Sequence, residues 1–130
     1  MIAIAADPAR PGVLYAGTGP AHTAGGVPGK VWRSGDGGRT WSETAELPRI
    51  GYYGELLPAG VADLAVTPAG LFAATGAGML RSTDQGTSWT DASEGMATNW
   101  VSLLAPDPGV PGRLYAGTYG FGLFTATFVP

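Results

Sequence analysis

The sequence predicts an all-β fold, a β-propeller segment of about three four-stranded antiparallel blades. Three observations support this prediction. The chain is rich in turn-forming residues, it contains internal repeats at the spacing of propeller blades, and its apolar residues fall in short runs between turn signals.

Turn-forming residues dominate the composition. Of 130 residues, 22 are Gly and 11 are Pro, and both types interrupt helices. An apolar content of 45% excludes a disordered chain, because it supplies enough buried surface to offset chain entropy. One domain covering residues 1–130 is expected at this length.

The first repeat pairs residues 7–18 with residues 107–118. Each copy begins with Asp-Pro and ends with Leu-Tyr-Ala-Gly-Thr, at a constant offset of 100 residues. A copy with a shorter turn, residues 67–75, lies between them. Three copies in order indicate a repeated β unit.

The second repeat consists of two octets, residues 34–41 (SGDGGRTW) and 82–89 (STDQGTSW), called here the first and second octet. Asp36 and Asp84 lie 48 residues apart, within the range of one propeller blade. Each Asp is expected to accept hydrogen bonds from the backbone N–H groups that follow it, while Gly takes the positive-φ positions. The Trp is expected to open the next strand and to cover the turn.

The apolar runs assign the strands. Blade 1 (about 1–47) has strands at 2–5, 13–16, 30–34 and 40–44, and blade 2 (about 61–93) at 61–66, 71–74, 79–82 and 88–91. Blade 3 (about 100–130) has strands at 101–105, 113–116 and 123–128, so the last blade is expected to lack its outer strand.

The octets resemble the Asp-box, or BNR repeat, whose pattern is S-x-D-x-G-x-T-W. The matching positions are Ser34, Asp36, Gly38, Thr40 and Trp41, and then Ser82, Asp84, Gly86, Ser88 and Trp89. Ser88 departs from the pattern but keeps the hydroxyl. Similar repeats occur in sialidases, xyloglucanases, sortilin-type receptors and photosystem assembly factors. The resemblance implies a β-propeller, and it does not select a function.

Three blades do not close a propeller ring, so the outer faces of the first and third blades are expected to be apolar and uncovered. Two alternatives are open. Either two copies form a six-bladed ring as a homodimer, or the chain is a fragment whose partners are the remaining blades of a longer chain. A three-blade monomer is disfavoured.

Long loops are expected on the rim opposite the octets, and loops held by a rigid scaffold often bind ligands. The octets lie on the other rim, where a structural role is expected. The candidate ligand-binding residues of the long loops are His22, Arg49, Tyr52, Tyr53, Trp100 and Tyr119. A glycan or a protein segment fits such an aromatic rim. Packing over the rim or at a subunit contact is the alternative explanation of these residues.

Asp63 and Glu55 are the candidate catalytic carboxylates, since a glycosidase uses two of them. Asp63 lies on an innermost strand, and its repeat equivalents, Ala3 and Leu103, are apolar. A solvated carboxylate in the propeller channel is the alternative reading. The resemblance to sialidases implies an arginine triad, yet only Arg49 falls on the correct rim.

Several classes of function are excluded by composition. A net charge of −3 and a single Lys argue against a nucleic-acid surface. His22 is the only histidine and there is no cysteine, so no metal site and no cofactor are expected. No apolar stretch is long enough to span a membrane and no basic leader is visible, which predicts a soluble chain. The compartment is left open.

The function expected from these observations is that of a non-catalytic binding or assembly module with an aromatic loop rim. The first alternative is a glycoside hydrolase, or a fragment of one, that uses Asp63 and Glu55. The second alternative is a self-assembling scaffold with no ligand.

Overall fold

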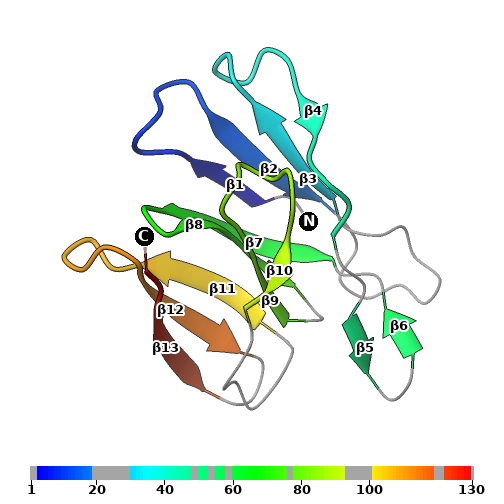
Figure 1. The fold of residues 1–130 in the computed structure, drawn as a ribbon, viewed down its shortest axis with the longest axis vertical. Helices are drawn as coiled ribbons and strands as arrows, with labels where there is room; N and C mark the ends of the chain where they lie inside the picture. Colours follow the sequence, from blue (N-terminus) through cyan, green and yellow to red (C-terminus); the bar gives the residue numbers. More distant parts are fainter. Residues whose placement is uncertain are drawn as a thin grey trace.

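The structure is a computed structural model. It describes residues 3–18, 30–47, 50–52, 55–57, 60–75, 78–92, 101–118 and 122–129, with only the backbone described at 50–52 and 55–57. All regular elements in these ranges are β-strands (Figure 1), which confirms the predicted all-β class. No helix in these ranges is long and apolar enough to cross a lipid bilayer.

Blade 1 is a four-stranded antiparallel sheet. Its order is β1 (Ala3–Ala6), β2 (Leu14–Thr18), β3 (Lys30–Ser34) and β4 (Ser42–Glu43). The inner strands agree with the prediction within two residues. The outer strand is shorter than predicted, because Thr40 and Trp41 belong to the turn rather than to β4.

Blade 2 repeats this arrangement with β7 (Val61–Thr67), β8 (Gly70–Thr75), β9 (Gly78–Ser82) and β10 (Thr90–Asp91). A β-bulge between Val61 and Asp63 interrupts the register of β7 with β8. Blade 3 has three strands in the described residues, β11 (Val101–Pro106), β12 (Arg113–Thr118) and β13 (Leu123–Thr127).

A short hairpin, β5 (Ile50–Tyr52) and β6 (Glu55–Leu57), forms a separate two-stranded sheet between blades 1 and 2 in the sequence. The sequence predicts a connecting loop for this segment. The prediction is wrong here because strands of three residues are too short to show an alternating pattern.

The three blades stack face to face, with β7 of blade 2 between β1 and β11 (Figure 1). One core fills each of the two junctions between blades. We call the face of a blade that meets the preceding blade its N-side face, and the face that meets the following blade its C-side face. The first core joins the C-side face of blade 1 to the N-side face of blade 2 and includes Tyr15, Val31, Leu64, Leu71 and Leu80. The second core joins blade 2 to blade 3 and includes Phe72, Met79, Leu104, Leu114 and Ala116.

The β1–β2 and β3–β4 turns lie at the same end of blade 1. The N–H of Gly37 donates to the carbonyl of Gly12 at 2.9 Å and joins the two turns directly. In blade 3 the N–H of Phe128 donates to the carbonyl of Gly112 at 2.8 Å in the same way. Gly112 has φ of +83°, and a Cβ there would collide with the Phe128 carbonyl, so this contact requires glycine. We call this end of the stack the octet end.

Candidate functional site

The first octet is a turn closed around the carboxylate of Asp36. Asp36 Oδ1 accepts from the N–H groups of Arg39 and Thr40 at 3.0 and 2.9 Å, and Oδ2 accepts from the Thr40 hydroxyl at 2.5 Å. The Ser34 hydroxyl donates to Asp36 Oδ1 and accepts from the N–H of Gly38. One carboxylate therefore serves several donors of the turn.

The second octet has the same arrangement around Asp84. Asp84 Oδ1 accepts from the N–H of Ser88 at 2.8 Å, and Oδ2 accepts from the Ser88 hydroxyl at 2.5 Å. Ser82 bridges Asp84 and the N–H of Gly86, each at 2.8 Å. Because the Ser88 hydroxyl makes the same bond as that of Thr40, the loss of the threonine methyl leaves the turn intact.

These hydrogen bonds shift the titration of both carboxyl groups. Donation from the Thr40 hydroxyl, followed by that of the Thr40 N–H, lowers the pKa of Asp36 from 3.8 to about 2. Donation from the Ser88 hydroxyl likewise lowers the pKa of Asp84. Both groups are therefore held as stable anions, which suits a turn anchor and does not suit a general acid at neutral pH.

The first repeat forms a second set of anchored turns. Asp7 Oδ1 accepts from the N–H of Ala9 at 2.9 Å, and Asp107 Oδ1 accepts from that of Gly109 at 2.8 Å. Thr67 takes this position in blade 2, where its hydroxyl accepts from the N–H of Ala69 at 3.0 Å. The hydroxyl thus replaces the carboxylate in the shorter turn.

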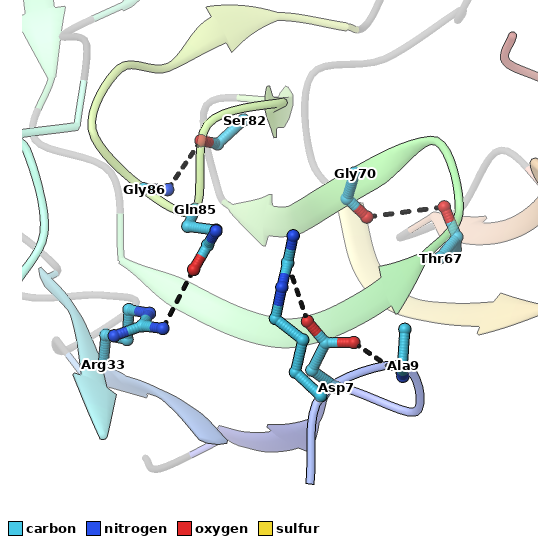
Figure 2. Close-up of polar contacts among 9 residues, drawn as sticks. Asp7, Ala9, Arg33, Thr67, Gly70, Ser82, Gln85 and Gly86 are labelled. Atoms are coloured by element: carbon cyan, nitrogen blue, oxygen red, sulfur yellow. Dashed lines mark hydrogen bonds and ion pairs between the residues drawn. The ribbon is translucent and has the colours of Figure 1, made fainter. Parts of the chain in front are cut away.

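A groove of about 630 Å³ lies between blades 1 and 2 at the octet end, and Figure 2 shows the polar contacts around it. Its lining includes Asp7, Arg10, Tyr15, Arg81 and Gln85. The Asp7 carboxylate is bonded to Arg10 at 3.3 Å, and the Arg81 guanidinium donates to the carbonyls of Ala69 and Val129 at 2.7 and 2.9 Å. These groups are engaged within the protein, so they form structural links rather than a binding constellation.

A further hydrogen bond joins blade 1 to Gln85, one of the residues that line the groove. Arg33 of blade 1 donates from Nη2 to Oε1 of Gln85 in the second octet at 2.9 Å (Figure 2). Gln85 has φ of +59°, which is uncommon for a residue with a side chain, and the equivalent residue of the first octet is Gly37. This contact was not predicted from the sequence, although Gln at a position that favours glycine is a visible signal.

Asp63 links blade 2 to blade 3. Its Oδ1 accepts from the N–H of Leu64 at 2.9 Å, and its Oδ2 accepts from the N–H of Leu104 on the next blade at 2.8 Å. Both bonds lie at the bulge in β7, which turns the side chain toward the neighbouring strand. The geometry supports a structural role for Asp63, and its catalytic role stays a prediction.

The aromatic rim cannot be assembled from the described residues. His22, Arg49, Tyr53, Trp100 and Tyr119 lie outside them. Tyr52 and Glu55 face each other in the register of the β5–β6 hairpin, but their side chains are not described. Their proposed roles stay predictions. In the part of the chain that the structure describes, no group of His, Cys, Asp and Glu is arranged to hold a metal ion.

Among the described residues, none covers the C-side face of blade 3. Tyr115 occupies the repeat position of Tyr15 and Phe72, which are only 1% and 0% exposed because the following blade covers each of them. Tyr115 is half-buried, and its neighbours Leu103 and Leu123 are 51% and 65% exposed. The C-side face is thus buried in blades 1 and 2 and open in blade 3.

Blade 1 leaves its N-side face uncovered. Ile4 is 65% exposed, whereas its repeat equivalents Leu64 and Leu104 are 5% and 8% exposed. Trp41 is 39% exposed, whereas the equivalent Trp89 is 8% exposed. In the part of the chain that the structure describes, no blade packs on this face, which accounts for each difference.

The comparisons with known proteins place the fold. No protein-family model matches the chain, and no curated protein matches its sequence. Among solved structures, 97% of the chain is similar to the GH74 xyloglucanase from Xanthomonas campestris, with a TM-score of 0.67 and 25% sequence identity. The chain spans 22% of the length of that enzyme. It therefore has the fold of one part of a propeller-type xyloglucanase, with antiparallel sheets of four, four and three strands.

Proposed function

We propose that this chain is a non-catalytic assembly module, a segment of β-propeller that acts by packing its two end faces against further β-blades. The observation that supports this proposal is the exposure of apolar side chains at repeat positions that are buried inside the stack. Ile4 is the clearest case, because its equivalents are covered in the other blades, and Tyr115 is half-buried where its equivalents are fully buried. Exposed apolar patches on a folded protein commonly mark interaction sites.

The absence of cysteine allows a direct test. A Leu123→Cys variant labelled with an environment-sensitive fluorophore places the probe on the C-side face of blade 3. We expect its emission to shift to the blue as protein concentration rises, because the face becomes covered. A Thr87→Cys variant places the control probe on the exposed second octet and is expected to show no shift. A Leu123 probe that stays in water at every concentration contradicts the proposal.

A glycoside hydrolase, or a part of one, is the second candidate function. The similarity to a xyloglucanase favours it, although the chain spans only 22% of that enzyme. Here Asp63 and Glu55 would be the two carboxylates, yet both oxygens of Asp63 already accept backbone hydrogen bonds. Release of reducing ends from xyloglucan, lost in Asp63→Asn, supports this candidate. No release across a panel of glycosides supports the assembly module.

The aromatic rim remains a proposed second surface of the module. Its candidate residues are those of the loops opposite the octet end, and a glycan or a protein segment is the expected ligand. Fluorescence changes at Trp100 on addition of glycans or peptides test this part separately from the end faces.

A further inference from the structure

We propose that the partner of both end faces is a second copy of this chain, so that two copies close a six-bladed ring about a two-fold axis. This inference rests on the proposed function and names its partner. The two uncovered faces are the C-side face of blade 3 and the N-side face of blade 1, which are the two kinds of face that form a junction between blades. At both junctions inside the chain, the C-side face of one blade packs on the N-side face of the next.

The repeat predicts which residues meet across the new junction. Between blades 2 and 3, the Asp63 side chain reaches the backbone of Leu104. The repeat equivalent of Asp63 in blade 3 is Leu103, and the equivalent of Leu104 in blade 1 is Ile4. Leu103 of one copy is therefore expected to lie against Ile4 of the other. Leu103 and Ile4, both exposed in the single chain, would bury each other at the position where Asp63 accepts from the Leu104 N–H in the junction of blades 2 and 3.

The two glycines of the repeated Leu-Tyr-Ala-Gly-Thr strands show how the new junction differs. A Cβ at Gly17 would collide with Val61 of the following blade, which fills that space. At Gly117 the same space is filled by Leu103 of its own blade. In blade 3, Leu103 therefore fills the space beside Gly117. Blade 1 of the second copy can pack on Leu103 without inserting a side chain into that space.

Charge does not oppose this contact. Most described positions on the C-side face of blade 3 are uncharged: Leu103, Ala105, Tyr115, Gly117, Leu123, Thr125 and Thr127. Arg113 also lies on this face, and its charge is paired with Asp107 at 3.8 Å. On the N-side face of blade 1 the carboxylate of Glu43 is paired with Lys30 at 2.7 Å, at the outer strand. Blade 2 carries Asp91 at the equivalent outer position, so the internal junction tolerates an acid there.

Symmetry favours a second copy over an unrelated occupant. The described residues of each chain leave one C-side face and one N-side face open, so two chains related by a two-fold axis cover all four faces. The resulting six blades fall within the four to eight of known propellers. The contact is head-to-tail and closes after two copies, which leaves no face open for further growth.

Sedimentation velocity tests the inference on the wild-type chain and on one variant of each face. The wild type is expected to sediment at twice the chain mass of 13.2 kDa. Ile4→Asp and Leu103→Asp are each expected to sediment as the single chain, because each places a charge in both junctions of the ring. Val129→Asp is the matched control, since Val129 is 82% exposed over the groove of blades 1 and 2 and lies on neither end face. It is expected to remain a dimer.

A mixture of the Ile4→Asp and Leu103→Asp variants tests whether unlike faces meet in the dimer. A mixed pair of Ile4→Asp with Leu103→Asp contains one unaltered junction and one doubly altered junction, so partial recovery of the dimer is expected. If only one of the two substitutions dissociates the dimer, the contact joins two like faces and the inference is wrong. A wild-type chain that stays single at high concentration, or that grows into longer polymers, also overturns it.

Folding of the variants is checked by circular dichroism, and Leu123→Lys provides a second substitution on the same face if Leu103→Asp fails to fold. Comparison of sedimentation with the Leu123 probe separates failure of the two-copy ring from failure of the proposed function. If the Leu123 probe becomes covered while the chain grows into longer polymers, the end faces pack on further β-blades as proposed and only the closed ring of two copies is excluded. If the probe is never covered, both proposals fail.

Discussion

Single carboxylates fix the turns at the octet end. Asp36 and Asp84 accept bonds from both backbone and hydroxyl donors of their own octets. The pattern of residues was sufficient to predict this chemistry, because all donors lie within the same eight residues. The bonds also predict how the protein responds to acid.

We predict that the chain loses stability as the pH falls from about 4 toward 2. The folded-state pKa of Asp36 is about 2, below the ordinary value of 3.8, so its contribution is complete above 3.8 and is lost as the carboxylate is protonated. Asp84 acts in the same direction. Melting temperatures measured across this range test the prediction. The Asp36→Asn variant is expected to show a lower melting temperature at neutral pH and a shallower fall in acid, and an unchanged pH profile would contradict this account.

The two tryptophans of the octets are predicted to differ in their contributions. Trp89 is 8% exposed in the junction of blades 1 and 2, so Trp89→Ala is expected to cost about 3–5 kcal/mol. Trp41 is 39% exposed, so Trp41→Ala is expected to cost roughly 1–2 kcal/mol. Urea unfolding of the separated chain, in the Leu103→Asp background, compares them. Equal costs would show that the two blades bury their tryptophans alike.

At the scale of the element, side chains that break the repeat join neighbouring blades. Gln85 replaces the glycine of the first octet and accepts from Arg33, while Asp63 replaces an apolar residue and reaches Leu104. The sequence shows that these residues depart from the repeat. It does not show what they contact, because their partners belong to another blade, 52 and 41 positions away.

The backbone of Gln85 predicts a difference between two substitutions. Gln85→Ala and Gln85→Gly both remove the bond to Arg33, but only glycine adopts the φ of +59° without strain. Gln85→Gly is therefore expected to be more stable than Gln85→Ala by about 1 kcal/mol. Denaturant unfolding of the pair measures this difference. Gly37→Ala in the first octet is the control and is expected to destabilise for the same reason, since Gly37 has φ of +76°.

Asp63 is predicted to contribute to stability through the bulge of β7. Asp63→Ala removes the acceptor of the Leu64 and Leu104 N–H groups and is expected to cost about 1–3 kcal/mol. Unfolding measurements give the cost, and faster hydrogen exchange of the Leu104 amide would locate it. A substitution that leaves stability unchanged while abolishing glycoside hydrolysis would instead assign Asp63 to catalysis.

For the whole molecule, the repeats were enough to predict the all-β class and the inner strands of each blade. The inner strands of blade 2 are buried on both faces and read as apolar runs, and the repeat carries this pattern to blades 1 and 3. The β5–β6 hairpin was missed because it lies outside the repeat. The predicted aromatic rim depends mainly on long loops, whose conformations are not set by a repeating pattern.

The assembly of whole chains predicts a melting temperature that depends on concentration. Association stabilises the folded state by mass action, so the melting temperature of the wild type is expected to rise with protein concentration. Ile4→Asp is expected to melt at one temperature at all concentrations. Differential scanning calorimetry over a hundredfold dilution series makes the comparison, and parallel behaviour of the two proteins would argue against association.

The octets also bear on the order of folding. Every hydrogen bond of the Asp36 carboxylate reaches a residue no more than four positions away. Such local contacts close with little loss of chain entropy, on the microsecond timescale of hairpin formation. Each octet is therefore expected to form its outer hairpin early in folding, so that the register of the outer strands is set before the distant blades pack.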